Sequence, residues 1–199
     1  MIDRSSAADD FSGANGLWGE WCLVSRGNLI REKIQMAKSK VFFSFHFDGD
    51  AWRTQTVRNI GAIEGSVPVK PNDWETVKRG GDAAIEKWID DQLKGKDCLM
   101  VLVGTETSNR KWVKREIAKA WDGKIGVMGI RIHKLLDQDS KSSKAGGNPF
   151  EEISLTNGAK LSQYVSLYDP AGADSKEVYA SISNNLQKWI DAAVANKRT

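Results

Sequence analysis

The sequence predicts an α/β protein with a flavodoxin-like parallel sheet of about five strands and helices on both faces. Apolar runs suited to buried strands alternate along the chain with segments of helical periodicity. A helix separates most successive strands, which is the pattern of a parallel sheet. The 199 residues, of which 40% are hydrophobic and 28% charged, are enough for one domain with a substantial core.

Five segments are expected to form the strands. KVFFSFH at 40–46 is an apolar, aromatic run, DCLMVLVG at 97–104 is the clearest buried strand, and IGVMGIRIH at 125–133 follows it. YVSLYD at 164–169 is the last strand. VPVK at 67–70 contains a proline, so this second strand is expected to be short or to lie at an edge.

Four helices are expected between and after these strands. The first spans 51–61, with Asp48 and Asp50 as candidate caps, and the second runs from Asp82 to Gly95. The third covers 109–123. The last begins at Asp174, which forms a capping-box pattern with Glu177, and carries apolar residues along one face.

Residues 1–36 differ from the rest and are expected to form a loose or partly helical N-terminal extension, whereas 37–199 form the folded domain. The start of the chain is polar and acidic, which is wrong for a secretory signal, and no apolar run approaches the roughly 18 residues of a membrane helix. The net charge of +3 is small and the charges are interleaved. We therefore expect a cytoplasmic protein that binds neither nucleic acid nor membrane.

Several familiar sites are excluded by their motifs. The chain has no GxGxxG after its first strand and no GxxxxGK[ST], which argues against a Rossmann dinucleotide site and a P-loop. The acidic HFDGD at 46–50 is unlike the phosphate loop of a flavodoxin, and Val103-Gly104-Thr105 stands where a phosphoryl receiver needs an aspartate. His46 and His133 lack an evident third ligand, so no metal is expected.

Ligands of open parallel sheets bind beyond the carboxyl ends of the strands, which limits the candidate residues to the segments after each strand. The helix at 109–123 is the most informative of these segments. Glu116 lies beside its predicted apolar stripe, with Trp112 on the same flank. A carboxylate at the edge of an apolar face has a raised pKa and is a candidate for catalysis. The alternative is a boundary glutamate paired with a basic residue one turn away.

The segments KVFFSFHFDGD, WRTQTVRN, NDWETVKRGGDAAIEKWID, CLMVLVGTETSNRKWVKREI, GIRIH and GGNPF resemble the TIR-like family that includes the Thoeris TIR protein. The similarity covers roughly residues 37–150. Its most specific part is GTETSNRKWVKREI, where Trp112 and Glu116 resemble the WxxxE signature of bacterial TIR proteins.

The resemblance implies an NAD-consuming enzyme in which Glu116 is the catalytic carboxylate and NAD is the substrate rather than a cofactor. It also implies a substrate pocket that includes strand-one residues and the loop after strand two. The expected substrate-binding residues are Ser44, Phe45, His46, Asp48, Arg53, Trp74, Thr105 and Trp112. Arg53, with Arg58 and Asn59, is expected either to contact phosphates or to have a structural role, and Asp48 is equally a candidate helix cap.

The family further implies that the product is a cyclic ADP-ribose isomer or a related ADP-ribose conjugate. A phage-derived trigger would activate the enzyme, the chain would self-associate on activation, and the messenger would activate a separate effector protein. Two alternatives remain open at this point. The first alternative to the enzyme is a non-catalytic TIR-like interaction module, and the second is a nucleotide-binding regulator that catalyses no reaction.

Overall fold

The computed structural model describes residues 39–60, 77 and 79–197. Within them, four parallel strands form one sheet in the order β1-β2-β3-β4. Their bounds are Val41–Phe45 for β1, Cys98–Val103 for β2, Gly126–Arg131 for β3 and Leu167–Tyr168 for β4. The predicted α/β class and four of the five predicted strands are confirmed. The 67–70 segment, like the proposed boundary near residue 36, lies outside the described residues and stays a prediction.

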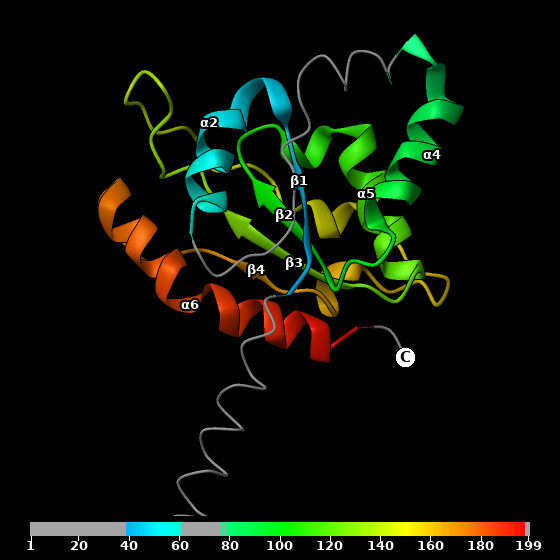
Figure 1. Ribbon diagram of the computed structural model, residues 1–199. Coiled ribbons are helices and arrows are strands. Elements are labelled where there is room, and N and C mark those ends of the chain that lie inside the picture. Colours follow the sequence, from blue (N-terminus) through cyan, green and yellow to red (C-terminus); the bar gives the residue numbers. More distant parts are fainter. Residues whose placement is uncertain (1–38, 61–76, 78, 198–199) are drawn as a thin grey trace, which may run out of the picture. The chain divides into compact units, whose positions relative to one another are not determined.

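Helices cover both faces of the sheet (Figure 1). α2 (Phe47–Arg58) and α6 (Ser175–Ala195) pack on one face, and α4 (Gly81–Leu93) and α5 (Lys111–Asp122) pack on the other. Successive side chains of a strand point to opposite faces, so Phe43 joins the core under α2 and α6 while Phe42 joins the core under α4 and α5. The β2 strand is buried along its whole length, as its apolar sequence predicts.

Three short 3-10 helices lie in the connections. They are η1 (Thr107–Asn109), η2 (Pro149–Glu152) and η3 (Leu161–Gln163). Phe150 of η2 and Leu161 of η3 are fully buried in the core that α4 and α5 cover. The polar segment that precedes η2 is mostly exposed, and the chain returns to the core at η2.

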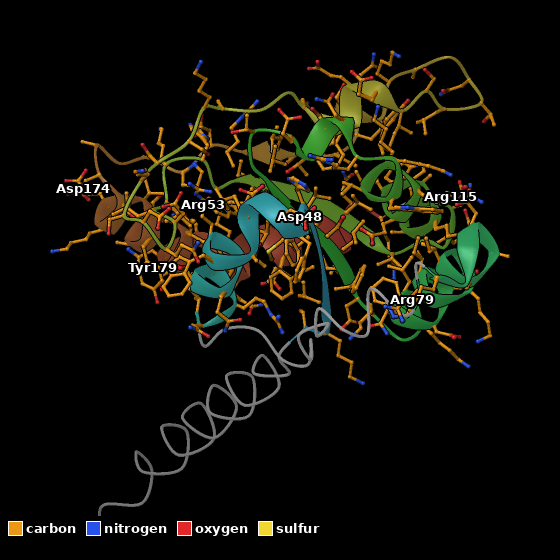
Figure 2. The ribbon with its side chains drawn as sticks, turned by 90° about the horizontal axis from the view of Figure 1, so that it is seen from above. Asp48, Arg53, Arg79, Arg115, Asp174 and Tyr179 are labelled. Carbon is orange, nitrogen blue, oxygen red and sulfur yellow. The ribbon has the colours of Figure 1, made fainter. Side chains whose placement is uncertain are left out.

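Two predicted helix starts have different outcomes. The prediction that Asp48 and Asp50 cap the first helix is wrong, because α2 begins at Phe47 with His46 in the N-cap position and both aspartates lie in its first turn. Carboxylates are favourable there because they face the positive end of the helix dipole. The prediction for Asp174, which Figure 2 labels at the start of α6, is confirmed: its carboxylate accepts hydrogen bonds from the backbone N–H groups of Lys176 and Glu177.

The junction between α2 and the end of β2 depends on Gly104. A Cβ atom at this position would lie far inside van der Waals contact with Oδ2 of Asp50. Glycine therefore allows the buried Asp50 carboxylate to pack directly against the backbone that follows β2. This contact places the start of α2 over the carboxyl end of the sheet, where the sequence predicts the site.

No helix in the described ranges combines the length and apolarity that crossing a membrane would require.

Candidate active site

The strand β1 and the helix α5 bring Ser44 and Glu116 together. Val113 and Ile117 bury the apolar stripe of α5 against the sheet, and Glu116 lies on the flank of that stripe. Its side chain is only 7% exposed, and Ser44 is 1% exposed. The Ser44 hydroxyl donates a hydrogen bond to Oε2 of Glu116. A buried polar side chain is therefore held by a partner that lies 72 residues away in the sequence.

The alternative in which Glu116 pairs with a basic residue one turn away is wrong. Among the described residues, Glu116 takes part in no ion pair, and the basic side chains of α5 pair with other carboxylates. These pairs are Lys111 with Asp82, Lys114 with Glu152, Arg115 with Glu86, and Lys119 with both Glu86 and Asp90. Most of the positive charge of α5 is thus neutralised by α4, which leaves Glu116 in an apolar environment.

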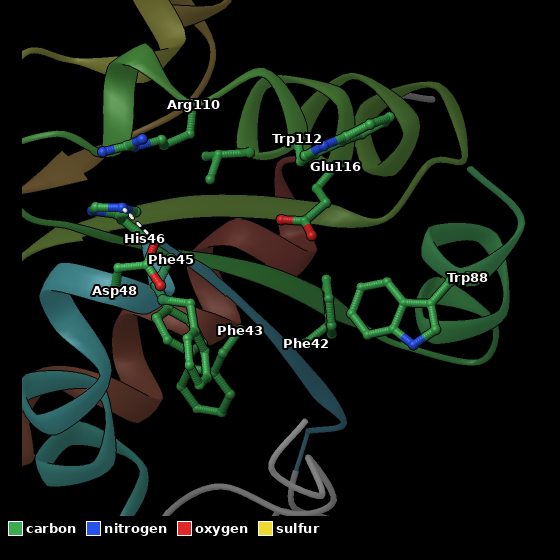
Figure 3. A pocket seen from close by; sticks show the side chains of 11 residues that line it. Phe42, Phe43, Phe45, His46, Asp48, Trp88, Arg110, Trp112 and Glu116 are labelled. Atoms are coloured by element: carbon green, nitrogen blue, oxygen red, sulfur yellow. Dashed lines mark ion pairs between the residues drawn. The ribbon is translucent and has the colours of Figure 1, made fainter. Parts of the chain in front are cut away.

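Glu116 lines a cavity of about 220 Å³ at the carboxyl end of β1 (Figure 3). The other lining residues are Phe42, Phe43, Phe45, His46, Phe47, Asp48, Trp88, Arg110, Trp112 and Val113. Polar groups lie at one end, near His46 and Arg110, whereas Trp88 and Phe42 lie at the opposite end. Ligand sites in proteins usually have mostly apolar linings with a few placed polar groups, and this cavity has that composition.

Burial raises the pKa of Glu116 to about 7, and the hydrogen bond from Ser44 acts in the opposite direction because it stabilises the carboxylate. A carboxyl group with this pKa is divided between its neutral and ionised forms near neutral pH. Perturbed groups of this kind in a cavity are typical of functional sites. The ionised form would interact strongly with a developing positive charge, since little water is present to screen it.

Four more of the residues predicted to bind substrate line this cavity: Phe45, His46, Asp48 and Trp112. His46 and Asp48 lie 3.8 Å apart, between Nε2 and Oδ2. Ser44 does not line the cavity but holds its carboxylate. Trp74 lies outside the described residues. Their predicted contacts with a substrate stay predictions, because they concern a ligand.

Arg53 and Thr105 are not among the lining residues, although both were expected to bind substrate. The hydroxyl of Thr105 donates a hydrogen bond to the carbonyl of Lys144, 2.7 Å away, and so fastens a loop. Arg53 is 3% exposed and donates to the carbonyls of Leu135 and Lys141 at 2.8 and 2.9 Å. The geometry therefore favours the structural role that the sequence left open for Arg53.

Six of the lining residues are not among those that the sequence predicts to bind substrate or to act in catalysis. They are Phe42, Phe43, Phe47, Trp88, Val113 and Arg110. Trp88 belongs to α4 and makes an edge contact with Phe42, with ring centroids 6.1 Å apart. Its helical spacing with Ile85 and Ile89 indicates a core position, so no sequence signal separates it from a packing residue. Arg110 precedes Lys111 in a basic segment, and only the fold shows which of these cations faces the cavity.

In the part of the chain that the structure describes, no three His, Cys, Asp or Glu side chains are grouped so that they would hold a metal ion.

A family model and a known protein match the region of the chain that forms the cavity. Residues 42–137 match a family model described as "Thoeris protein ThsB, TIR-like domain". A protein of Bacillus cereus (strain MSX-D12), named "Putative cyclic ADP-D-ribose synthase ThsB1", is 33% identical over 129 residues. That similarity covers 59% of this chain and 64% of the relative, which is just under two thirds of the relative's length.

Proposed function

We propose that the chain is an NAD-consuming enzyme of antiphage defence, since its residues 42–137 match the family model of the TIR-like domain of Thoeris protein ThsB. It cleaves the N-glycosidic bond between nicotinamide and ribose, with Glu116 as the catalytic carboxylate. The observation that carries this proposal is the buried Glu116 carboxyl, held by Ser44 in an aromatic cavity at the end of β1. The name of the similar Bacillus cereus protein refers to the same class of chemistry.

The residues that line the cavity are suited to cleavage of the bond between nicotinamide and ribose. When the C1′–N bond of the nicotinamide ribose breaks, its electron pair goes to the pyridine nitrogen, and neutral nicotinamide leaves. The positive charge that the pyridinium carried passes to the ribose as oxocarbenium character. The Glu116 carboxylate stabilises this charge, and the rings of Trp88, Phe42 and Trp112 provide flat surfaces for the departing base. No strong general acid is needed, because nicotinamide leaves without a proton.

The aromatic lining also bears on the product. After nicotinamide leaves, either water or another nucleophile of the ADP-ribose itself attacks C1′, giving linear or cyclic ADP-ribose respectively. An apolar cavity limits the access of water and so favours the internal nucleophile. We therefore propose a cyclic ADP-ribose isomer, or a related ADP-ribose conjugate, as the product. Such a product would act as a messenger on a separate effector protein, with a phage-derived trigger and self-association controlling its synthesis.

Turnover of NAD by the purified protein tests this function. The full chain is incubated with NAD, with and without lysate of phage-infected cells, and nicotinamide release is followed by liquid chromatography. Mass spectrometry against linear and cyclic ADP-ribose standards identifies the product. We expect stoichiometric nicotinamide and a product with either the mass of ADP-ribose minus water, for a cyclic isomer, or the larger mass of an ADP-ribose conjugate. If NAD remains intact in every mixture while the protein is folded, the chain is a binding module and the proposal is wrong.

Ser44→Ala is expected to move the acid limb of the kcat/KM–pH profile to higher pH by roughly one unit. Activity requires the ionised carboxylate, so it should rise as the pH increases through about 7, the pKa of Glu116. The Ser44 hydrogen bond lowers that pKa, and its removal leaves the effect of burial unopposed. Ser44→Thr retains the hydroxyl and should keep the parental limb. An unchanged limb in folded Ser44→Ala would show that the hydrogen bond does not tune Glu116.

A further inference from the structure

Arg110 differs from every other basic residue of the α5 region. The four lysines and arginines within α5 are paired with carboxylates of α4 or η2. Arg110, in the N-cap position of α5, is exposed and forms no ion pair with any carboxylate of the described residues. It is also the one residue with a permanent positive charge among the described side chains that line the cavity. An unpaired guanidinium at a cavity is available for an external anion.

The charge is placed at one end of the cavity. Figure 3 shows Arg110 above His46 at the end away from Trp88 and Phe42, with the Glu116 carboxylate between the two ends. A cationic flat ring would be favoured at the aromatic end, where it meets the faces of the rings. An anion would be favoured at the Arg110 end. The first turn of α5 adds to this preference, because backbone N–H groups there have no partner within the helix.

The size of the cavity limits how much of a dinucleotide enters it. At about 220 Å³ it is smaller than the roughly 300–1,000 Å³ of sites that enclose a drug-sized ligand. Only one end of NAD therefore fits among the described lining residues, and the diphosphate leaves the cavity at its rim. With nicotinamide at the aromatic end and the ribose at Glu116, the diphosphate emerges beside Arg110.

We propose that Arg110 binds the diphosphate of the substrate and thereby selects dinucleotides over nucleosides that carry no phosphate. This inference rests on the proposed function and adds a specificity-determining residue to it. A guanidinium forms two parallel hydrogen bonds to phosphate oxygens, which fixes the orientation of the bound group as well as attracting it. Because the contact is the same before and during bond cleavage, it contributes to KM and not to kcat.

The test compares a substrate that has phosphates with one that has none. Arg110→Ala should raise KM for NAD about tenfold and leave kcat within about twofold. With nicotinamide riboside, which carries no phosphate, the same variant should match the parent. Lys114→Ala, one turn further along α5, removes the same charge outside the cavity and serves as the matched control. Arg110→Lys should fall between the parent and the alanine variant, since it keeps the charge but loses the fork.

A binding measurement separates failure of this inference from failure of the proposed function. ADP-ribose is titrated into the protein at two salt concentrations, and the total tryptophan fluorescence is followed, to which Trp88 and Trp112 of the cavity contribute. Weaker binding in Arg110→Ala, with a smaller salt dependence than the parent, supports the inference even if NAD is not cleaved. Equal loss of activity toward NAD and nicotinamide riboside, or ADP-ribose binding that is absent or independent of Arg110, would overturn it.

Discussion

Glu116→Gln is expected to reduce nicotinamide release from NAD by at least about a hundredfold. The amide keeps the size of the side chain and a hydrogen-bonding oxygen for Ser44, but it carries no charge to stabilise the oxocarbenium-like ribose. The loss should appear in kcat, because the interaction is made in the transition state. Steady-state rates of nicotinamide formation with saturating NAD provide the measurement. A variant that is folded and turns over NAD at the parental rate would show that Glu116 is not the catalytic carboxylate.

Two controls separate this loss from misfolding. Glu106→Gln removes an exposed carboxylate from the segment after β2 that does not line the cavity, and it should retain parental activity. The second control is stability. The pKa of Glu116 in the folded protein is about 7, above the usual 4.5, so the folded state holds more protons between these values and becomes less stable as the pH rises through them. At pH 8, Glu116→Gln should therefore melt at or above the temperature of the parent.

The position of Glu116 follows from local periodicity, whereas its partner does not. Helical spacing places Glu116 beside the stripe of Val113 and Ile117 and puts Trp112 on the same flank, and the structure agrees. The hydrogen bond from Ser44 depends on how β1 aligns with β2 and on how α5 crosses the sheet, both of which are long-range properties. The sequence therefore predicts that Ser44 lies near the site, as a contact of the substrate, but it does not predict the hydrogen bond from Ser44 to the carboxylate.

The roles of two arginines also depend on long-range contacts that the local sequence does not predict. The sequence makes Arg53 after β1 a candidate contact for a phosphate, whereas it does not single out Arg110 before α5. The fold separates them, because the loop that follows β3 folds over Arg53 and buries it, while Arg110 stays at the rim of the cavity. The path of the loop after β3 determines that the guanidinium of Arg53, and not that of Arg110, has partners among the described residues. The local sequence around each arginine does not predict that path.

Arg53→Ala is expected to lower the free energy of unfolding by about 3–5 kcal/mol, the usual effect of removing one partner of a buried charged network. The guanidinium reaches from α2 to the segment that follows β3. Its hydrogen bonds go to the carbonyls of Gly49, Leu135 and Lys141 and to the carboxylates of Asp50 and Asp137. Denaturant unfolding followed by tryptophan fluorescence measures the change. Arg115→Ala, which breaks an exposed pair with Glu86, should change stability by less than about 1 kcal/mol.

The pH dependence of the Arg53→Ala variant distinguishes electrostatics from packing. Asp50 is 3% exposed, and burial raises its pKa while Arg53 opposes that rise. Without Arg53, the folded-state pKa of Asp50 rises further above its unfolded value, so the variant loses stability as the pH increases through this range. Its deficit relative to the parent should therefore shrink as the pH falls and Asp50 becomes protonated. Adding Asp50→Asn should recover part of the loss at neutral pH, since it removes the unpaired buried charge. A deficit that is constant with pH and unchanged in the double variant would mean that Arg53 contributes through packing alone.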